Sequence, residues 1–535
     1  MKKIILFIAA VVAFNALNAQ KIIGPQKVVP EQKLRFVEQI IERFYVDSVD
    51  AEHVVEEGII AMLKTLDPHS LYSNPEETRA LTEPLQGNFS GIGIQFNMAT
   101  DTLYVIQTVA GGPSEKVGIL AGDRILTAND TLISGVKMNT ADVMKHLRGP
   151  KGSVVDLGVL RNGSPEVIKF RVVRDDIPLY SVDAAYMVDG NTGFIRVSKF
   201  AETTADEVKK AIADLRKKRM KNLIIDLESN GGGYLNAAHE FASIFLDKGD
   251  MVVYTDGEKV APAYYRTESA GDMRDGRVVV MVNQYSASAS EILAGALQDN
   301  DRGVIVGRRT FGKGLVQRPF PLPDGSMVRL TTARYYTPSG RSIQKPYKSG
   351  DDDAYQLDML HRYESGEFLS ADSVHFADSL RFKTLKSGRT VYGGGGIMPD
   401  RFVPVDTSFY SNYYRDLVAK GVINRYSLDY LDAHRKALKS TYRNEDDFVK
   451  KFEVTPEMLN SLIELGKKEG VEYDEAQFET SKKYIATILK ALIGRDLFEL
   501  STYYRIVNPL SPTFNEAVKL ISSPDEYESL LSAPK

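Results

Sequence analysis

The sequence predicts a multidomain α/β protein with four regions in order. These are an N-terminal helical segment, a β-rich module, an α/β core with a mixed sheet, and a C-terminal helical region. Three observations support this prediction. The chain has 535 residues, which is too long for one hydrophobic core. Apolar spacing changes from helical to strand-like near Gly87. Strand-like and helix-like runs then alternate between about Ile177 and Pro404, before helical spacing returns.

Residues 1–19 have the layout of a secretory signal peptide. Lys2 and Lys3 precede an apolar run that is too short to span a bilayer comfortably, and small residues lead to a cleavage site after Ala19. We therefore expect an exported, periplasmic protein without a stable membrane anchor. The chain has no cysteine, which excludes disulfides, thiol catalysis and lipid attachment to an N-terminal cysteine.

Charge and composition exclude several functional classes. The 67 basic and 71 acidic residues give a mildly acidic chain without a basic run. This balance argues against binding of nucleic acid or of strongly anionic lipid. Without cysteine and without an H-E-x-x-H motif, we expect no zinc site, and the sequence indicates no other metal or cofactor.

The first two predicted folded regions cover residues 20–86 and 87–176. In the first, KLRFVEQIIERFYV and VVEEGIIAMLKTL have apolar residues at helical spacing, and the helical pattern is expected to extend to about Leu85. In the second, short β-like runs surround one helical stretch, Thr140 to Leu147. This pattern predicts a compact module of mostly β structure.

Residues 177–404 form the predicted α/β core. Runs such as KNLIIDLE, RVVVMVN and RGVIVG have the character of buried strands, with amphipathic helical segments between them. A polar insertion at about 346–386 contains Asp351–Asp353, which we interpret as a solvated loop rather than a metal site. Residues 405–535 are predicted to be helical, and their tyrosines are interpreted as core residues.

A serine cluster opens a predicted helix in the core. Ser288-Ala289-Ser290-Glu291 fits the capping-box pattern, so Ser288 on its own is interpreted as a helix cap. A serine at a helix start also lies beside free N–H groups that favour developing negative charge. The N–H of Ala289 is therefore a candidate donor to an oxyanion.

A run of three glycines supplies a second candidate oxyanion donor. The segment IIDLESNGGG joins a predicted strand to the helix that begins near Leu235. Glycines there allow the backbone to approach a substrate carbonyl closely, which makes Gly232 and Gly233 candidates. An ordinary strand–helix turn is the alternative interpretation.

Lys313 is the candidate base for Ser288. Serine needs a base to accept its proton, and a buried lysine can be neutral enough to do so. Lys313 lies between two glycines in TFGKGLVQ, and Gln317, four residues on, is expected on the same face. The rival base is a histidine, of which only His239 follows the glycine run closely. A serine–histidine triad therefore stays open at this stage.

Together these motifs resemble the carboxyl-terminal processing peptidases, also called tail-specific proteases. The resemblance rests on SASASEI with AGALQD, TFGKGLVQ, IIDLESNGGG, ARYYTPSGRSIQ and GGGGIMPD. It implies a crotonase/ClpP-like protease core in which Ser288 is the nucleophile, Lys313 the general base and Gln317 its support. Many relatives have proline where Gly231 stands, so which glycine supplies the oxyanion N–H stays open.

The resemblance also covers the β-rich module, which looks like a PDZ domain. FSGIGI contains a loop similar to the PDZ carboxylate-binding loop, formed here by Gly91, Ile92, Gly93 and Ile94. GGPSEKVGILAGDRIL resembles a second PDZ signature, and DPHSLY the helical segment that usually precedes the domain. Such a module adds the substrate tail as an extra strand.

We therefore expect an exported serine endopeptidase that binds protein or peptide substrates by their C-termini and cleaves them with a Ser–Lys dyad. The alternative is a non-catalytic periplasmic adaptor that binds peptide tails. A homodimer or an adaptor protein is a further expected partner, and the resemblance does not cover the tail beyond Val405.

Overall fold

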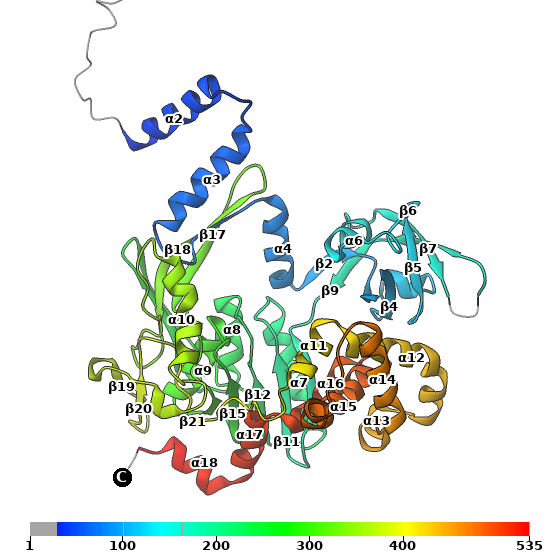
Figure 1. The fold of residues 1–535 in the computed structure, drawn as a ribbon. Helices are drawn as coiled ribbons and strands as arrows, with labels where there is room; N and C mark the ends of the chain where they lie inside the picture. The colour runs from blue at the N-terminus through cyan, green and yellow to red at the C-terminus, as the bar shows by residue number, and fades with distance from the viewer. Residues whose placement is uncertain (1–28, 100, 162–163, 534–535) are drawn as a thin grey trace, which may run out of the picture. The chain divides into compact units, whose positions relative to one another are not determined.

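The computed structural model describes residues 29–99, 101–161 and 164–533 (Figure 1). The predicted signal peptide, residues 1–19, lies outside the described residues. The chain divides between Leu66 and Asp67 into two compact units, and each is described by itself. None of the helices in the described ranges combines the length and the apolar character that a membrane crossing requires.

The described part of the first unit consists of helices α2 (Pro30–Phe44) and α3 (Ala51–Lys64). The Asp50 side chain caps α3 by accepting the N–H groups of Glu52 and His53. Helix α2 contains no buried residue, and large apolar side chains such as Phe36 and Ile40 are exposed along it.

The second unit begins with strand β1 (Leu71–Ser73) and helix α4 (Pro75–Gln86). Asn74 and Glu77 form a capping box at the start of α4. The prediction of a helical region from about Glu31 to Leu85, broken at Asp67-Pro68, is wrong at β1, because Leu71–Ser73 pair with the distant strand β18. Pairing with a partner far along the chain overrides the local pattern at this point.

The β-rich module contains a six-stranded antiparallel sheet in the order β3-β4-β5-β7-β8, with β6 beside β5. Strand β2 pairs instead with β9, which closes the module where the chain leaves it. Helix α6 begins and ends at the predicted residues, and Asn139 caps it. The module has its own buried core. Its elements are β2 (Asn88–Gly91), β3 (Ile94–Ala99), β4 (Thr102–Thr108), α5 (Pro113–Lys116), β5 (Arg124–Ala128), β6 (Thr131–Leu132), α6 (Thr140–Leu147), β7 (Val154–Leu160), β8 (Ile168–Val173) and β9 (Asp175–Pro178).

The α/β core is built on a mixed sheet in the order β10-β11-β12-β15-β16-β21. Strands β10 and β11 are antiparallel, and the other neighbours are parallel. The fold class predicted from the sequence is confirmed. The strands of this sheet are β10 (Val182–Met187), β11 (Thr192–Val197), β12 (Asn222–Asp226), β15 (Val278–Val282), β16 (Val304–Gly307) and β21 (Arg401–Phe402).

Helices cover both faces of this sheet, which explains why its central strand β15 is apolar at every position. In β15, Val278, Val280 and Val282 face one core, whereas Val279 and Met281 face the other. The first core is completed by α7 (Thr204–Lys217), α8 (Leu235–Ser243) and α9 (Ala289–Asp299). The second is completed by residues of α17 (Pro512–Ser522) and α18 (Pro524–Leu531), from the far end of the chain.

A second sheet is formed by β1, β18, β13 and β14, with β17 paired to β18. Its other strands are β13 (Met251–Gly257), β14 (Val260–Arg266), β17 (Leu315–Pro321) and β18 (Met327–Tyr336). The insertion after β18 holds α10 (Asp352–Glu364), short 3₁₀ turns, β19 (Arg381–Lys383) and β20 (Thr390–Tyr392). The solvated loop predicted for Asp351–Asp353 is thus wrong, because Asp351 caps α10 and the other two begin it.

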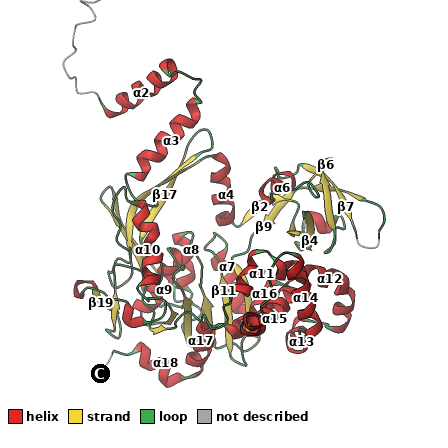
Figure 2. Cartoon of the chain, viewed as in Figure 1, coloured by secondary structure: helices red, strands yellow, loops and turns green. Residues whose placement is uncertain are grey.

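Helices α11 to α16 form a separate cluster around their own apolar core (Figure 2). The cluster contains α11 (Asn412–Ala419), α12 (Val422–Thr441), α13 (Glu445–Lys451), α14 (Pro456–Lys468), α15 (Glu475–Leu497) and α16 (Leu500–Val507). The region beyond Val405 therefore has two roles. It builds this helical cluster, and with α17 and α18 it covers the core sheet.

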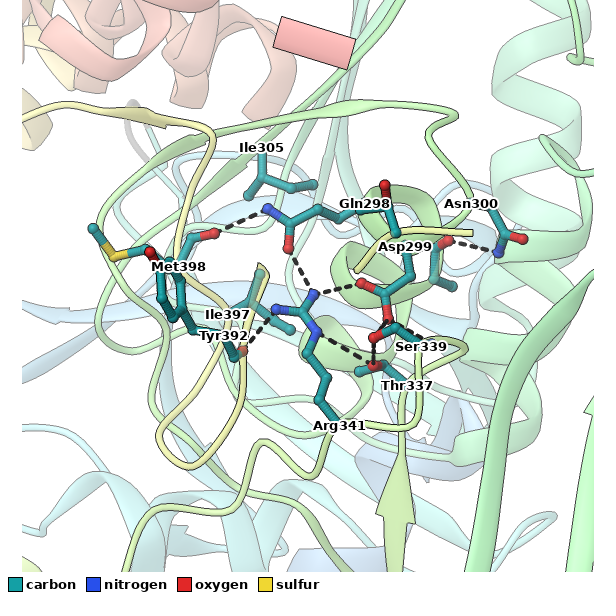
Figure 3. Close-up of polar contacts among 12 residues, drawn as sticks. Gln298, Asp299, Asn300, Ile305, Thr337, Ser339, Arg341, Tyr392, Ile397 and Met398 are labelled. Atoms are coloured by element: carbon teal, nitrogen blue, oxygen red, sulfur yellow. Dashed lines mark hydrogen bonds and ion pairs between the residues drawn. The ribbon is translucent and has the colours of Figure 1, made fainter. Parts of the chain in front are cut away.

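The C-terminal end of α9 is fixed by a buried arginine (Figure 3). Arg341 and Asp299 form an ion pair of 2.7 Å, and both side chains are 0% exposed. The same guanidinium donates to the side chain of Gln298 and to the carbonyl of Tyr392. Asp299 also accepts two hydrogen bonds from Ser339. A buried charge is tolerated when it is paired and hydrogen-bonded in this way.

Candidate active site

Ser288 lies in the turn that joins β15 to α9. Its backbone has φ 57° and ψ −114°, a left-handed conformation that is costly for a residue with a side chain. Such a strained strand-to-helix turn exposes a serine hydroxyl at the edge of a sheet. The flanking serines hold the turn, since the hydroxyls of Ser286 and Ser290 donate to the carbonyls of Leu227 and Asn230. The outer two of the three alternating serines therefore anchor the turn that holds Ser288.

A cavity of about 480 Å³ brings the predicted catalytic residues together. Ser288, Lys313 and Gln317 all line it, together with the glycine run at 231–233 and residues of α4. Lys313 lies just before β17, and Gln317 lies within this strand. A register shift at Val316 and Gln317 interrupts the simple alternation that we expected between them. Both side chains nevertheless line the same cavity.

The environment of Lys313 favours its neutral form. Burial is the main cause that lowers the pKa of its ammonium to about 8, and the positive charge of Arg329 adds to this shift. The charges of Glu291 and Asp67 act in the opposite direction. No carboxylate of the described residues forms an ion pair with the Lys313 ammonium. This amine can therefore lose its proton close to neutral pH.

Glu291 joins the backbone around Ser288 to the backbone around Lys313. Its buried carboxylate accepts the N–H of Ser288 at 2.8 Å and the N–H of Lys313 at 2.9 Å. It also accepts the N–H of Gly312 and the hydroxyl of Thr310. Burial raises the pKa of this carboxyl to about 7, although the four hydrogen bonds oppose the shift. From the sequence, Glu291 was expected only as part of a helix cap.

Gln317 is oriented by a hydrogen-bonded chain that the sequence did not reveal. Its side-chain amide donates to the Thr331 hydroxyl at 3.3 Å, and that hydroxyl donates to Asp67 at 2.9 Å. Because the single proton of Thr331 is given to Asp67, Thr331 can only accept from Gln317. The amide nitrogen is thereby turned toward Thr331, which leaves the side-chain oxygen free for another donor.

The glycine run requires glycine for steric reasons. A Cβ atom at Gly232, where φ is +98°, would lie 2.8 Å from the Ser288 Cβ. At Gly233, with φ +151°, it would lie 2.1 Å from the carbonyl oxygen of Phe200. Substitution at either position would therefore push the glycine run away from the serine turn.

The N–H groups of this run differ in availability. Gly232 donates its N–H to the Asn230 side chain at 2.8 Å, so our prediction of Gly232 as an oxyanion donor is not supported. The carbonyl of Gly232 and the N–H of Tyr234 both bond Phe200, so the intervening Gly233 N–H faces the other way. Neither Gly233 nor Ala289 donates its N–H to another group within the described ranges.

His239 is not brought to the serine. Its Nε2 atom is 3.0 Å from the carbonyl oxygen of Arg266, and His239 is absent from the residues that line the Ser288 cavity. No other histidine of the described chain lines that cavity either. His69 contacts the hydroxyl of Tyr355, and burial lowers its pKa to about 4. The geometry therefore favours lysine over histidine as the partner of Ser288.

A second cavity of about 480 Å³ lies along β3 in the β-rich module. Ile92, Gly93 and Ile94 line it on one side, and Met144 and Leu147 of α6 line it on the other. Gly91 ends β2 and is buried beside the ring of Phe89, so it does not line this cavity. A groove between a strand and a helix can accept an extended peptide as an added strand.

Comparisons with known proteins agree with these two sites. A model described as peptidase family S41 matches residues 191–351, and a PDZ domain model matches residues 90–172. A third model, described only as a family of unknown function, matches residues 413–499.

Two curated relatives and one solved structure illustrate the similarity. A carboxy-terminal-processing protease of Bartonella bacilliformis is 36% identical over 64% of this chain and 80% of its own length. A probable CtpA-like serine protease of Staphylococcus aureus is 33% identical over 72% of this chain and 77% of its own. The solved photosystem II D1 C-terminal processing protease is 30% identical, covers 59% of this chain and 91% of its own, and has a TM-score of 0.34.

Proposed function

Because this chain belongs to the carboxy-terminal-processing proteases of peptidase family S41, we propose that it is an exported endopeptidase that cleaves proteins with a Ser288–Lys313 dyad after its PDZ domain has bound their C-terminal tails. The chain is a serine-type peptidase with a PDZ domain. One observation carries the assignment of residues. Ser288 lines the same cavity as a lysine whose pKa is lowered to about 8.

The proposed reaction begins with neutral Lys313, which accepts the proton of the Ser288 hydroxyl. The Ser288 oxygen then attacks the peptide carbonyl, and the carbonyl π electrons move to oxygen. The N–H groups of Ala289 and Gly233 stabilise the resulting oxyanion. Lys313 gives its proton to the leaving amine as the C–N bond breaks. It then accepts a proton from the water that attacks the acyl-enzyme carbonyl, and it returns this proton to the Ser288 oxygen as the ester C–O bond breaks.

Gln317 supports Lys313 in this scheme. The chain through Thr331 to Asp67 turns the amide nitrogen of Gln317 away, so its oxygen is available to accept from the lysine amine. Glu291 fixes the backbone of both dyad residues. In the PDZ domain, the N–H groups of the loop at Ile92 and Gly93 would hold the tail carboxylate while β3 pairs with the tail.

The test uses a protein substrate with an apolar C-terminal tail. Ser288→Ala and Lys313→Ala should each abolish cleavage while the thermal unfolding transition stays unchanged. Substantial activity in Lys313→Ala would refute its role as the base. A fluorophosphonate should label the parent chain at Ser288 and should not label Ser288→Ala. A non-catalytic adaptor would not be labelled, and membership of a peptidase family already disfavours that alternative.

Export is the second part of the proposal. It is supported by Lys2 and Lys3 before the apolar run and by the small residues that end at Ala19. Sequencing of the N-terminus of the protein recovered from the periplasm should begin at Gln20. Recovery of a chain that still carries residues 1–19 in the cytoplasm would contradict export. Homodimer formation and an adaptor protein stay predictions.

A further inference from the structure

The helical cluster after Val405 reaches the groove of the PDZ domain. Besides residues of the domain, Arg495 and Leu500 line the cavity along β3. Arg495 lies in the last turn of α15, and Leu500 is the first residue of α16. The corner between these two helices is therefore part of the groove, although a PDZ groove needs only its own strand and helix to accept a tail.

A second contact joins the same helical cluster to the PDZ domain. Arg124 on β5 and Asp432 on α12 form an ion pair of 2.7 Å, in which each side chain is 22% exposed. Arg124 also stacks on the ring of Tyr104, at 4.6 Å from its centroid. Strand β4 lies between β3 and β5 in the sheet. The contact at the β3 groove and the ion pair at β5 are therefore on opposite sides of β4.

On the helical side, the residues that make the two contacts belong to one packed cluster. Leu431 beside Asp432, and Leu497 and Ile506 around the α15–α16 corner, are buried in the same apolar core. Arg435 of α12 also donates to the carbonyl of Asp496 at the end of α15. A close-packed core has low compressibility, so a displacement of one of its helices also displaces the helices packed against it. The ion pair at Asp432 thus helps to fix where the α15–α16 corner meets the groove.

The chemistry of the lining indicates what the groove accepts. Arg495 is engaged by Asp496, with contacts of 2.6 and 3.0 Å, and Arg148 is paired with Glu83 at 2.6 Å. Both guanidinium groups lining the groove are therefore neutralised within the chain. The remaining lining is mainly apolar and includes Leu500, which is 36% exposed. An apolar tail suits such a surface better than an acidic one.

We infer that the α15–α16 corner is the outer wall of the tail-binding groove and that Leu500 contacts the apolar side chains of the bound tail. This inference rests on the proposed recognition of tails by the PDZ domain. It assigns a binding role to the helical cluster, of which residues 413–499 match a family of unknown function and Leu500 follows that match directly. The corner would select tails by shape and apolarity, while the PDZ loop holds the carboxylate.

The experiment measures binding to the full chain that carries Ser288→Ala, which prevents cleavage. The probe is a fluorescein-labelled decapeptide that ends in Val-Ile-Val, read by anisotropy. Leu500→Asp should raise its Kd about tenfold because a charge would replace an apolar contact, and Leu500→Met should leave the Kd unchanged. The matched control is Val418→Asp on α11, where the parent side chain is 51% exposed and does not line the groove.

The ion pair provides an independent test. Asp432→Arg places two like charges together and should weaken binding of the same peptide severalfold. Combining Arg124→Asp with Asp432→Arg restores an opposite-charge pair and should recover most of the affinity. Failure of the double variant to recover affinity, with an unchanged unfolding transition, would show that the ion pair does not position the wall.

A peptide with a C-terminal amide separates the two proposals. If the amide binds as tightly as the free acid, recognition of the tail carboxylate fails, and the inference fails with it. If the free acid binds much more tightly but Leu500→Asp binds it like the parent, tail recognition stands and the wall is refuted. An equal loss in Leu500→Asp and Val418→Asp would also refute the wall.

Discussion

A cationic side chain lies beside each end of helix α9, and only one of the two has a counter-ion. Beside its first turn, Lys313 has a partly buried ammonium without an ion-pair partner in the described chain, and its pKa is lowered to about 8. Beside its last turn, Arg341 is fully buried but is paired with Asp299 and hydrogen-bonded on several sides (Figure 3). Burial is common to both sites, and the difference lies in the counter-ion.

The presence or absence of a counter-ion determines whether the cation suits the proposed chemistry or the stability of the fold. Without a counter-ion, burial destabilises the charged lysine, so the amine becomes a base near neutral pH. With a counter-ion, the arginine forms a buried ion pair that links α9 to the loop after β18. Glu291 shows how the chain places a carboxylate near Lys313 without pairing the ammonium. It binds the backbone N–H of Lys313, not the side chain.

Removing each cation should therefore have opposite consequences for stability. Arg341→Met leaves Asp299 buried without its partner and should lower the free energy of unfolding by about 3–5 kcal/mol. Lys313→Met removes an unpaired buried charge and should leave the free energy of unfolding unchanged or higher, although activity is lost. Urea denaturation of both variants in the same buffer checks this contrast. Equal destabilisation by the two substitutions would contradict it.

Glu291→Gln tests the link between the two dyad segments. The amide keeps the size of the side chain but replaces one acceptor oxygen with a donor, so it cannot accept from all four groups. A small displacement of Ser288 from Lys313 should lower kcat by on the order of 10- to 100-fold. KM for a tailed substrate should change little because Glu291 does not line the PDZ groove. A kcat equal to that of the parent would exclude this positioning role.

The sequence predicted features that depend on local pattern. The bounds of α6 and α9 and the buried strands of the core follow from capping residues and apolar spacing. Ser288, Lys313 and Gln317 were singled out by their motifs, and they line one cavity. The resemblance to the family is confirmed by the similarity to curated relatives.

The features that were missed depend on contacts between distant segments. Asp67 and Thr331 are 264 residues apart, so no local pattern could link them to Gln317. Strand β1 forms only because β18 offers an edge. The availability of the Gly232 N–H depends on the rotamer of Asn230. The PDZ and helical regions each form a core, and sequence alone could not show that the α15–α16 corner lines the groove.

The pH dependence of activity should follow the protonation of Lys313, the lysine without an ion-pair partner in the described chain. In the proposed mechanism only neutral Lys313 acts as a base, so kcat/KM should fall about tenfold per unit as the pH falls below about 8, the value to which the pKa of Lys313 is lowered. Arg329→Gln removes a positive charge that lowers this pKa. The midpoint of the profile should therefore move to higher pH in that variant. A midpoint that stays in place, or that moves to lower pH, would contradict the electrostatic account.

The smallest expected effect comes from the hydroxyl that orients Gln317. Thr331→Val keeps the shape of the side chain and removes both hydrogen bonds in the chain from Asp67 to Gln317. Loss of about one neutral hydrogen bond should lower kcat about fivefold and shift the midpoint of the pH profile, with KM unchanged.

Thr332→Val on the same strand is the matched control for this effect. The Thr332 hydroxyl is buried and has no hydrogen-bond partner within the described chain, so its removal should not reduce activity. If both variants lose the same activity, the cause is general loosening of β18. If only Thr331→Val loses activity and its pH profile shifts, the orientation of Gln317 tunes the pKa of Lys313, which then depends on placed dipoles as well as on burial.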